Sequence, residues 1–155
     1  MNPKKKKALQ NIAFLTALFL FFVFTRTVIQ PTIVVGQSME PTLKEGNLLL
    51  VNRLAEKYER FDIVVASYEN SYLIKRVIGL PGETIQIKNN KIYIDNKEIN
   101  DVYNGSMDGG MFLEPTLIKE NEYVIIGDNR NNSSDSRYFG PVSVDTIMGK
   151  AISNK

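Results

Sequence analysis

An apolar run near the start of the chain constrains the fold more than any other feature. From Ala8 to Thr25 the residues are apolar except for Gln10, Asn11, Thr16 and the final Thr25. Eighteen helical residues rise about 27 Å at ~1.5 Å each, just enough to cross a thin hydrocarbon core. The run therefore predicts a single membrane-spanning helix at residues 8–25.

Charge decides the orientation expected for that helix. Lys4 to Lys7 precede it and Arg26 follows it, and these are the only charged residues among the first 26. By the positive-inside rule, residues 1–7 form a cytoplasmic tail and residues 26–155 form a domain outside the cytoplasm. A cleavable secretion signal has the same pattern. However, Thr25 to Ile29 contains no good small-x-small cleavage site, which favours an uncleaved anchor in the cell membrane.

The remainder of the chain is slightly acidic and has no cysteine. Residues 27–155 carry 14 Lys and Arg against 17 Asp and Glu, a net charge of −3, which argues against nucleic-acid binding. Without cysteine no disulfide supports the domain, so its fold must depend on a hydrophobic core.

Beyond the anchor, short runs of Val, Ile, Leu and Tyr alternate with Gly, Asn, Asp and Pro, a pattern that predicts a mostly β domain. The expected strands are residues 32–35, 47–52, 62–67, 72–78, 84–88, 91–94 and 123–127. Asn89 and Asn90 predict a tight hairpin. Its buried face consists of Ile85, Ile87, Ile92 and Ile94. We also expect a helical turn at 54–60, a short helix or strand end at 143–150 and a mobile loop at 103–110.

Two apolar runs outside the anchor have two interpretations, core packing or a surface resting on the bilayer. The first comprises Val28, Ile29, Ile33, Val34 and Val35, and the second comprises Met111, Phe112, Leu113, Leu117 and Ile118.

The absence of histidine and cysteine restricts covalent catalysis to a hydroxyl nucleophile with an amine base. Ser38 is a candidate because Pro41 favours a turn just after it, although a serine in a turn is usually structural. Lys75 lies 37 residues downstream in the apolar run Leu73 to Ile78. Burial there would lower its pKa and supply a neutral amine. In the alternative interpretation, Lys75 faces outward on the strand and has no catalytic role.

Three ordered segments strengthen the candidates: Gly36 to Leu43, Tyr72 to Glu83 and Gly127 to Gly140. Together with the basic N-terminus and the apolar run, they make the chain resemble the bacterial type I signal peptidases over almost its whole length. The resemblance implies a coiled β-sheet catalytic domain on a membrane anchor. It implies a serine endopeptidase, without a cofactor, that cleaves signal peptides from exported preproteins after Ala-x-Ala-like small residues. Its partners would be those signal peptides, the lipid bilayer and, indirectly, the secretion translocon.

The resemblance also assigns roles to particular residues. Ser38 would be the nucleophile, with its backbone N–H in the oxyanion hole, and Lys75 the general base. Ser133 would hydrogen-bond and orient Lys75. Asp135 with Arg137 would form a structural ion pair, as would Asp128 with Arg76. The substrate pocket would be lined by Val34, Val35, Met39, Leu43, Leu73 and Ile74.

The chain departs from the family pattern at two positions. Gly36 stands where some members have a serine that donates to the oxyanion, and Phe61 stands where glycine is usual. The segment Asp128 to Ser133 also resembles a calcium loop, but Arg130 occupies a ligand position and the sixth position is not glycine, which argues against a metal.

Two other functions fit parts of the sequence. A self-cleaving repressor-type protease would share the Ser/Lys pair, but the anchor and the acidic domain oppose it. A noncatalytic, membrane-anchored β domain that binds exported peptides or a partner is the alternative from a different class. The histidine-dependent signal peptidases of the endoplasmic reticulum are excluded because the chain has no histidine.

Overall fold

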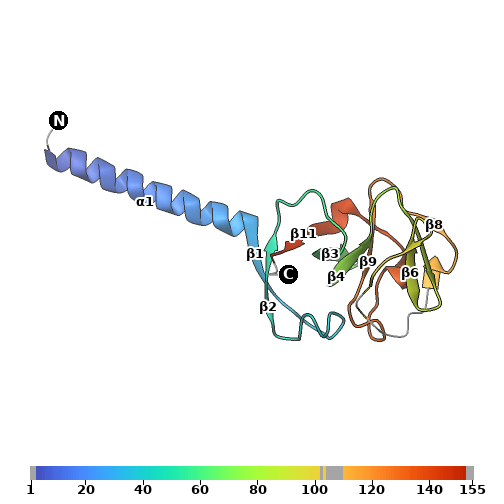
Figure 1. Ribbon diagram of the computed structural model, residues 1–155. Coiled ribbons are helices and arrows are strands. Elements are labelled where there is room, and N and C mark those ends of the chain that lie inside the picture. Colours follow the sequence, from blue (N-terminus) through green and yellow to red (C-terminus); the bar gives the residue numbers. More distant parts are fainter. Residues whose placement is uncertain (1–2, 102, 104–109, 153–155) are drawn as a thin grey trace.

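The computed structural model describes residues 3–101, 103 and 110–152. A long helix, α1 (Pro3–Val28), extends away from a β domain and continues directly into the first strand (Figure 1). The apolar part of α1 is not buried against the β domain, and its leucine and phenylalanine side chains are exposed. A helix with large apolar side chains on all sides requires an apolar surrounding that this domain does not provide.

The β domain contains two antiparallel sheets in the described residues. The larger sheet has the order β1-β2-β11-β3-β4-β9-β10, and the smaller has the order β7-β6-β5-β8. The strands of the larger sheet are β1 (Ile29–Ile33), β2 (Leu48–Asn52), β3 (Ile63–Tyr68), β4 (Ser71–Gly79), β9 (Glu122–Ile126), β10 (Val142–Ser143) and β11 (Ile147–Ala151). Those of the smaller sheet are β5 (Thr84–Lys88), β6 (Lys91–Ile94), β7 (Lys97–Glu98) and β8 (Thr116–Leu117). The prediction of a mostly β domain is confirmed.

The hairpin of the smaller sheet forms as expected. Lys88 pairs with Lys91, and Asn89 and Asn90 between them adopt positive φ values of 51° and 61°, which asparagine tolerates well. All four predicted isoleucines are buried. They form a core with residues of β4 and β9 and with Phe112 and Ile118.

A second core lies beneath the N-terminal part of the larger sheet. It consists of Val34, Met39, Leu49, Val51, Ile63, Val65 and Ala151. Because Met39 belongs to this core and is only 1% exposed, the turn that carries Ser38 is anchored to the sheet.

The first strand differs from its prediction. β1 starts at Ile29 and pairs from Ile29 with Asn52 to Ile33 with Leu48, while Val34 and Val35 lie beyond it. The helix passes into the strand without a glycine or proline at the junction, so the sequence alone did not reveal where the strand begins.

The helical turn predicted at 54–60 is wrong. Side chains hold this segment instead of helical backbone bonds: the Tyr58 hydroxyl donates to the Ala55 carbonyl at 2.8 Å, and the Glu59 N–H donates to the Asp62 carboxylate at 2.8 Å. At 143–150 the 3-10 helix η2 (Val144–Thr146) leads into β11, so this segment is mainly a strand. The short helices η1 (Gly110–Phe112) and α2 (Ser136–Phe139) were not predicted. The loop expected at 103–110 falls mostly outside the described residues.

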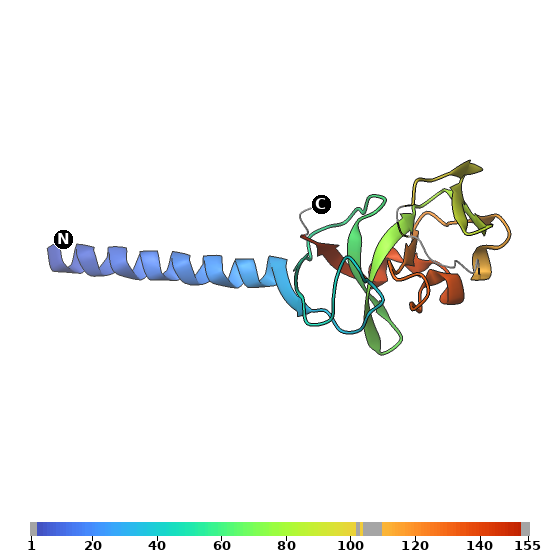
Figure 2. The same cartoon turned by 60° about the horizontal axis from the view of Figure 1, so that its bottom comes forward.

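The two apolar runs separate into core and surface positions. Val34, Phe112 and Ile118 are buried, whereas Ile33, Val35, Met111, Leu113 and Leu117 are exposed. However, η1 and β8 lie at the end of the domain farthest from α1 in both views (Figures 1 and 2). Only the first run is therefore close to the anchor.

Phe61 occupies a conformation that suits glycine. Its φ is 72°, yet its N–H donates to the Val77 carbonyl at 2.8 Å and its carbonyl accepts from Arg76 at 2.7 Å. A non-glycine residue in the left-handed region costs about 1–2 kcal/mol. The left-handed conformation of Phe61 is thus held by these two hydrogen bonds, at a cost in stability.

We predict that Phe61→Gly is more stable than Phe61→Ala by about 1 kcal/mol, since both variants lose the ring and only Ala retains the φ strain. Chemical denaturation of the full-length protein in detergent measures the difference. The opposite order, which is normal at ordinary backbone positions, would show that Phe61 is not strained.

Candidate active site

The nucleophile candidate lies on a compact turn after β1. Gly36 has a φ of 82°, the Glu40 N–H donates to the Gln37 carbonyl at 3.1 Å, and the Leu43 N–H donates to the Met39 carbonyl at 2.9 Å. These bonds hold Ser38 half-buried at the edge of a cleft. Its own backbone N–H makes no hydrogen bond within the described residues, so it is an available donor beside the hydroxyl.

Lys75 reaches this hydroxyl from β4. The residue pairs with Val64 across the sheet and is only 3% exposed. Its Nζ lies 2.7 Å from the Ser38 Oγ, within hydrogen-bonding distance. Two residues 37 positions apart in the chain therefore meet at the reacting distance expected for a nucleophile and its base.

The surroundings of Lys75 favour the neutral amine. Burial is the largest influence and lowers the pKa of Lys75, and nearby Arg137 lowers it further. The carboxylates of Asp135 and Asp128 act in the opposite direction. Both are paired with arginines, which limits their effect, and the net result is a pKa below the ordinary lysine value.

The segment from Gly127 to Arg137 clamps the nucleophile turn. The Asn129 N–H donates to the Ser38 carbonyl at 3.0 Å, and its side-chain amide donates to the Gln37 carbonyl at 3.1 Å. At Gly127 a Cβ atom would lie 2.5 Å from the Ser38 carbonyl oxygen and would also collide with the Ser133 hydroxyl. Glycine is therefore required for this close approach.

Both expected ion pairs are present in buried form. Arg76 binds Asp128 through two bonds of 2.8 and 2.7 Å, and Arg137 binds Asp135 through two bonds of 2.8 and 2.9 Å. Asp135 also accepts from the Gly127 N–H at 3.0 Å. The Asp135–Arg137 pair therefore connects the two ends of the segment from Gly127 to Arg137. Paired bonds of this kind fix orientation as well as charge.

A third buried ion pair was missed by the sequence analysis. Arg130 binds Asp101 through its terminal nitrogens and donates to the Gly127 carbonyl through Nε at 3.0 Å. The ring of Tyr103 lies between Arg130 and Arg76, with centroid distances of 5.7 and 4.6 Å. The sequence analysis used Arg130 only as an argument against a metal site. In the structure, its guanidinium links Asp101 to the Gly127 carbonyl beside the candidate site.

Ser133 does not make the bond that the resemblance implies. Its Oγ is buried and has no hydrogen-bond partner among the described residues. It nevertheless lies beside Gly127 and the Ser38 carbonyl, next to the catalytic candidates.

A cleft of about 400 Å³ opens beside Ser38 and Lys75. Of the predicted pocket residues, Val34, Val35, Met39, Leu73 and Ile74 line it. Leu43 does not; it packs against the core around Met39. Lining residues that the sequence analysis missed are Thr32, Ile33, Gly36, Val65, Ser71 and Tyr72.

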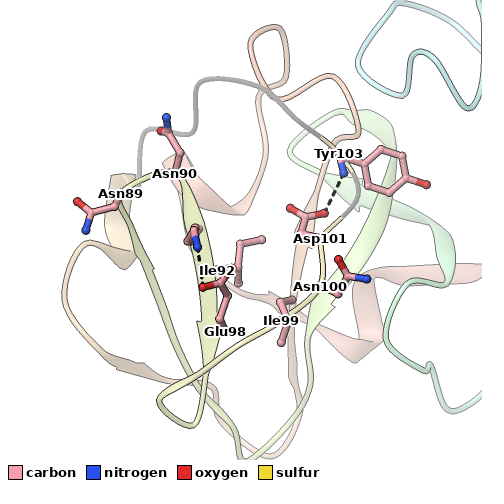
Figure 3. A pocket seen from close by; sticks show the side chains of 9 residues that line it. Asn89, Asn90, Ile92, Glu98, Ile99, Asn100, Asp101 and Tyr103 are labelled. Carbon is pink, nitrogen blue, oxygen red and sulfur yellow. Dashed lines mark hydrogen bonds and ion pairs between the residues drawn. The ribbon is translucent and has the colours of Figure 1, made fainter.

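Another pocket, of about 380 Å³, lies on the smaller sheet (Figure 3). It is bordered by Asn89, Asn90, Glu98, Asn100 and Asp101 and holds neither a serine nor a buried lysine. Within the described residues no group of three potential metal ligands occurs. Lys75 is the one buried lysine among the described residues, and it lies at the Ser38 cleft.

Known proteins share this sequence and architecture. The family model "Signal peptidase, peptidase S26" matches residues 7–154. Signal peptidase I of Bacillus caldolyticus is 38% identical over 152 residues, covering 86% of this chain and 80% of the relative. Signal peptidase I V of Bacillus subtilis is 40% identical, covering 74% and 78%. Signal peptidase IB of Staphylococcus aureus is 32% identical, covering 94% and 88%.

Among solved structures, a signal peptidase I from Enterococcus faecalis matches with a TM-score of 0.51 and 30% identity. The match covers 61% of this chain and 96% of that one. The chain therefore belongs to the signal peptidase I family and is a serine peptidase.

Proposed function

We propose that this protein is a membrane-anchored signal peptidase I that uses Ser38 as its nucleophile and Lys75 as its general base. The observation that carries the proposal is the 2.7 Å contact between Lys75 Nζ and Ser38 Oγ, made by an amine that is almost completely buried. The noncatalytic alternative gives no reason to bury a lysine against a serine hydroxyl.

The reaction follows from this contact. The neutral amine of Lys75 takes the proton from Ser38 Oγ as the oxygen attacks the carbonyl carbon of the scissile peptide bond. The tetrahedral oxyanion accepts a hydrogen bond from the Ser38 N–H, and Lys75 then gives its proton to the leaving amine. Water, deprotonated by the same lysine, hydrolyses the resulting ester and restores the serine.

Two details of this site belong to the proposal. Gly36 carries no hydroxyl, so the second oxyanion donor comes from backbone or water. Ser133 is the orienting group: its unsatisfied hydroxyl is available to accept from the Lys75 ammonium once the proton leaves Ser38.

The cleft suits an extended peptide with small side chains. β9 pairs with β4 only from Arg76 onward, so within the described residues the edge of β4 from Ser71 to Lys75 has no strand paired to it on that side. A substrate strand can bind there by β-augmentation, with alternate side chains entering the cleft. We label residues upstream of the scissile bond P1, P3 and P5. Val34 and Met39 close the floor, which favours alanine-sized P1 and P3 side chains.

The proposed membrane location is supported by the anchor helix and by an adjacent apolar surface. Residues 8–25 span the bilayer, residues 1–7 remain in the cytoplasm because of Lys4 to Lys7, and the catalytic domain 26–155 lies outside. Next to the end of α1, one face of β1, β2 and the C-terminal segment exposes Ile33, Leu48, Leu50 and Ile152. This face rests on lipid, where signal peptides arrive from the translocon.

We predict that Ser38→Ala, Lys75→Ala and Lys75→Arg each lose more than about 10³-fold in cleavage of a preprotein with an Ala-x-Ala site. Arginine keeps the charge but cannot act as a base at accessible pH. For the unaltered protein, kcat/KM should rise with pH through the lowered pKa of Lys75, because only the neutral amine is active. Substantial cleavage by Lys75→Arg would mean that this residue contributes only a positive charge.

The absence of native cysteine permits a clean test of topology. In intact bacterial cells, a membrane-impermeant maleimide should label Lys57→Cys, an exposed position in the β domain, but not Lys5→Cys. Lys5→Cys should react only after lysis, and the unaltered protein should never react. Labelling of Lys5→Cys from outside would reverse the proposed orientation.

A further inference from the structure

A β-bulge places Met148 at a small hollow next to the substrate cleft. In β11, Ile147 pairs with Ala66 and Gly149 pairs with Val65, so Met148 is an extra residue without a partner on β3. Bulges of this kind redirect a side chain and locally bend the strand. Glycine follows at 149 because a Cβ there would lie 2.8 Å from a methyl group of Val51 and would collide with the Asn52 carbonyl.

Met148 forms part of a small hollow that continues the cleft. The hollow measures about 60 Å³ and is lined by Gln30, Thr32, Val51, Val65, Tyr72 and Met148. Three of these residues, Thr32, Val65 and Tyr72, also line the cleft beside Ser38. The two spaces therefore adjoin each other through these shared walls, and Ser38 lines the cleft but not the hollow.

Strand geometry assigns the hollow to a substrate position. Tyr72 precedes Lys75 by three residues on β4, which corresponds to about 10 Å at ~3.3 Å per residue. In an extended peptide the P1, P3 and P5 side chains point to the same side, and P5 lies about 13 Å upstream of P1. With P1 beside Ser38 and P3 in the adjoining cleft, the next side chain on that side reaches the hollow.

We propose that this hollow is an upstream subsite that binds an aliphatic P5 side chain of the substrate, with Met148 as its adaptable wall. This inference rests on the proposed function, since it extends the same substrate groove. The walls supplied by Val51, Val65 and Met148 are apolar. The flexible thioether chain of methionine allows a small hollow to admit side chains of different shape. P5 thereby adds a specificity contact beyond the small residues next to the scissile bond.

The test compares two preproteins that share an Ala-x-Ala site and differ only in leucine or serine at P5. For the full-length protein in detergent, we expect kcat/KM to be about tenfold higher with leucine, a discrimination within reach of an apolar pocket. The same change at P4 or P6 should alter kcat/KM less than about twofold. The P5 ratio is the kcat/KM for leucine at P5 divided by that for serine. Met148→Ser should reduce this ratio to below about two. Met111→Ser, which changes an exposed methionine in η1, should leave the ratio unchanged.

Tyr72→Ser is a second variant for the same purpose, because Tyr72 is 70% exposed and belongs to none of the three hydrophobic cores. It too should reduce the P5 ratio. Equal cleavage of both preproteins, a preference located at P4 or P6, or an unchanged ratio in both variants would overturn the subsite. Failure to cleave either preprotein would instead contradict the proposed function, so the two failures are distinguishable.

Discussion

The site depends on one contact, the 2.7 Å approach of a buried lysine amine to a serine hydroxyl. In water this pair would be inert, because a lysine with a pKa of about 10.4 is almost fully protonated at neutral pH. Burial of Lys75 on β4 disfavours the ammonium ion and lowers its pKa. The rest of the domain shields this amine from water and holds it against the Ser38 hydroxyl.

That burial has a thermodynamic consequence. Between the lowered pKa of folded Lys75 and about 10.4, the unfolded chain binds more protons than the folded one, so stability rises with pH across this interval. Below it, the folded state carries the full penalty of a buried ammonium ion. The cores beneath the Ser38 turn and the hairpin must offset this penalty.

The buried arginines keep the electrostatics balanced. Unpaired, Asp128 and Asp135 would stabilise the protonated lysine and weaken it as a base. Paired with Arg76 and Arg137, the same carboxylates instead hold the backbone that encloses Ser38. Removing one partner would leave an uncompensated buried charge, which is generally costly. In the proposed mechanism, the ion pairs therefore support the base Lys75 as well as the fold.

The sequence predicted those features that follow from a local residue pattern, from the residue types that the chain lacks, or from the family resemblance. Ser38 and Lys75 became candidates because the chain has no histidine or cysteine, and the resemblance of three ordered segments to the type I signal peptidases singled them out. The hairpin isoleucines followed from alternation. The Arg130 and Asp101 pair was not predictable, since it joins residues 29 positions apart without a local signal. Met148 was missed for a related reason: a bulge interrupts the two-residue period from which strand faces are inferred.

The most direct test of this account is an NMR titration of the Lys75 side chain in the full-length protein, with ¹³C and ¹⁵N labels in lysine and assignment by the Lys75→Arg variant. The exposed Lys57 serves as an internal reference within the same sample. The account predicts that Lys75 loses its proton at a pH clearly below that of Lys57. A Lys75 midpoint equal to or above the Lys57 midpoint would contradict the proposal that a neutral lysine activates Ser38.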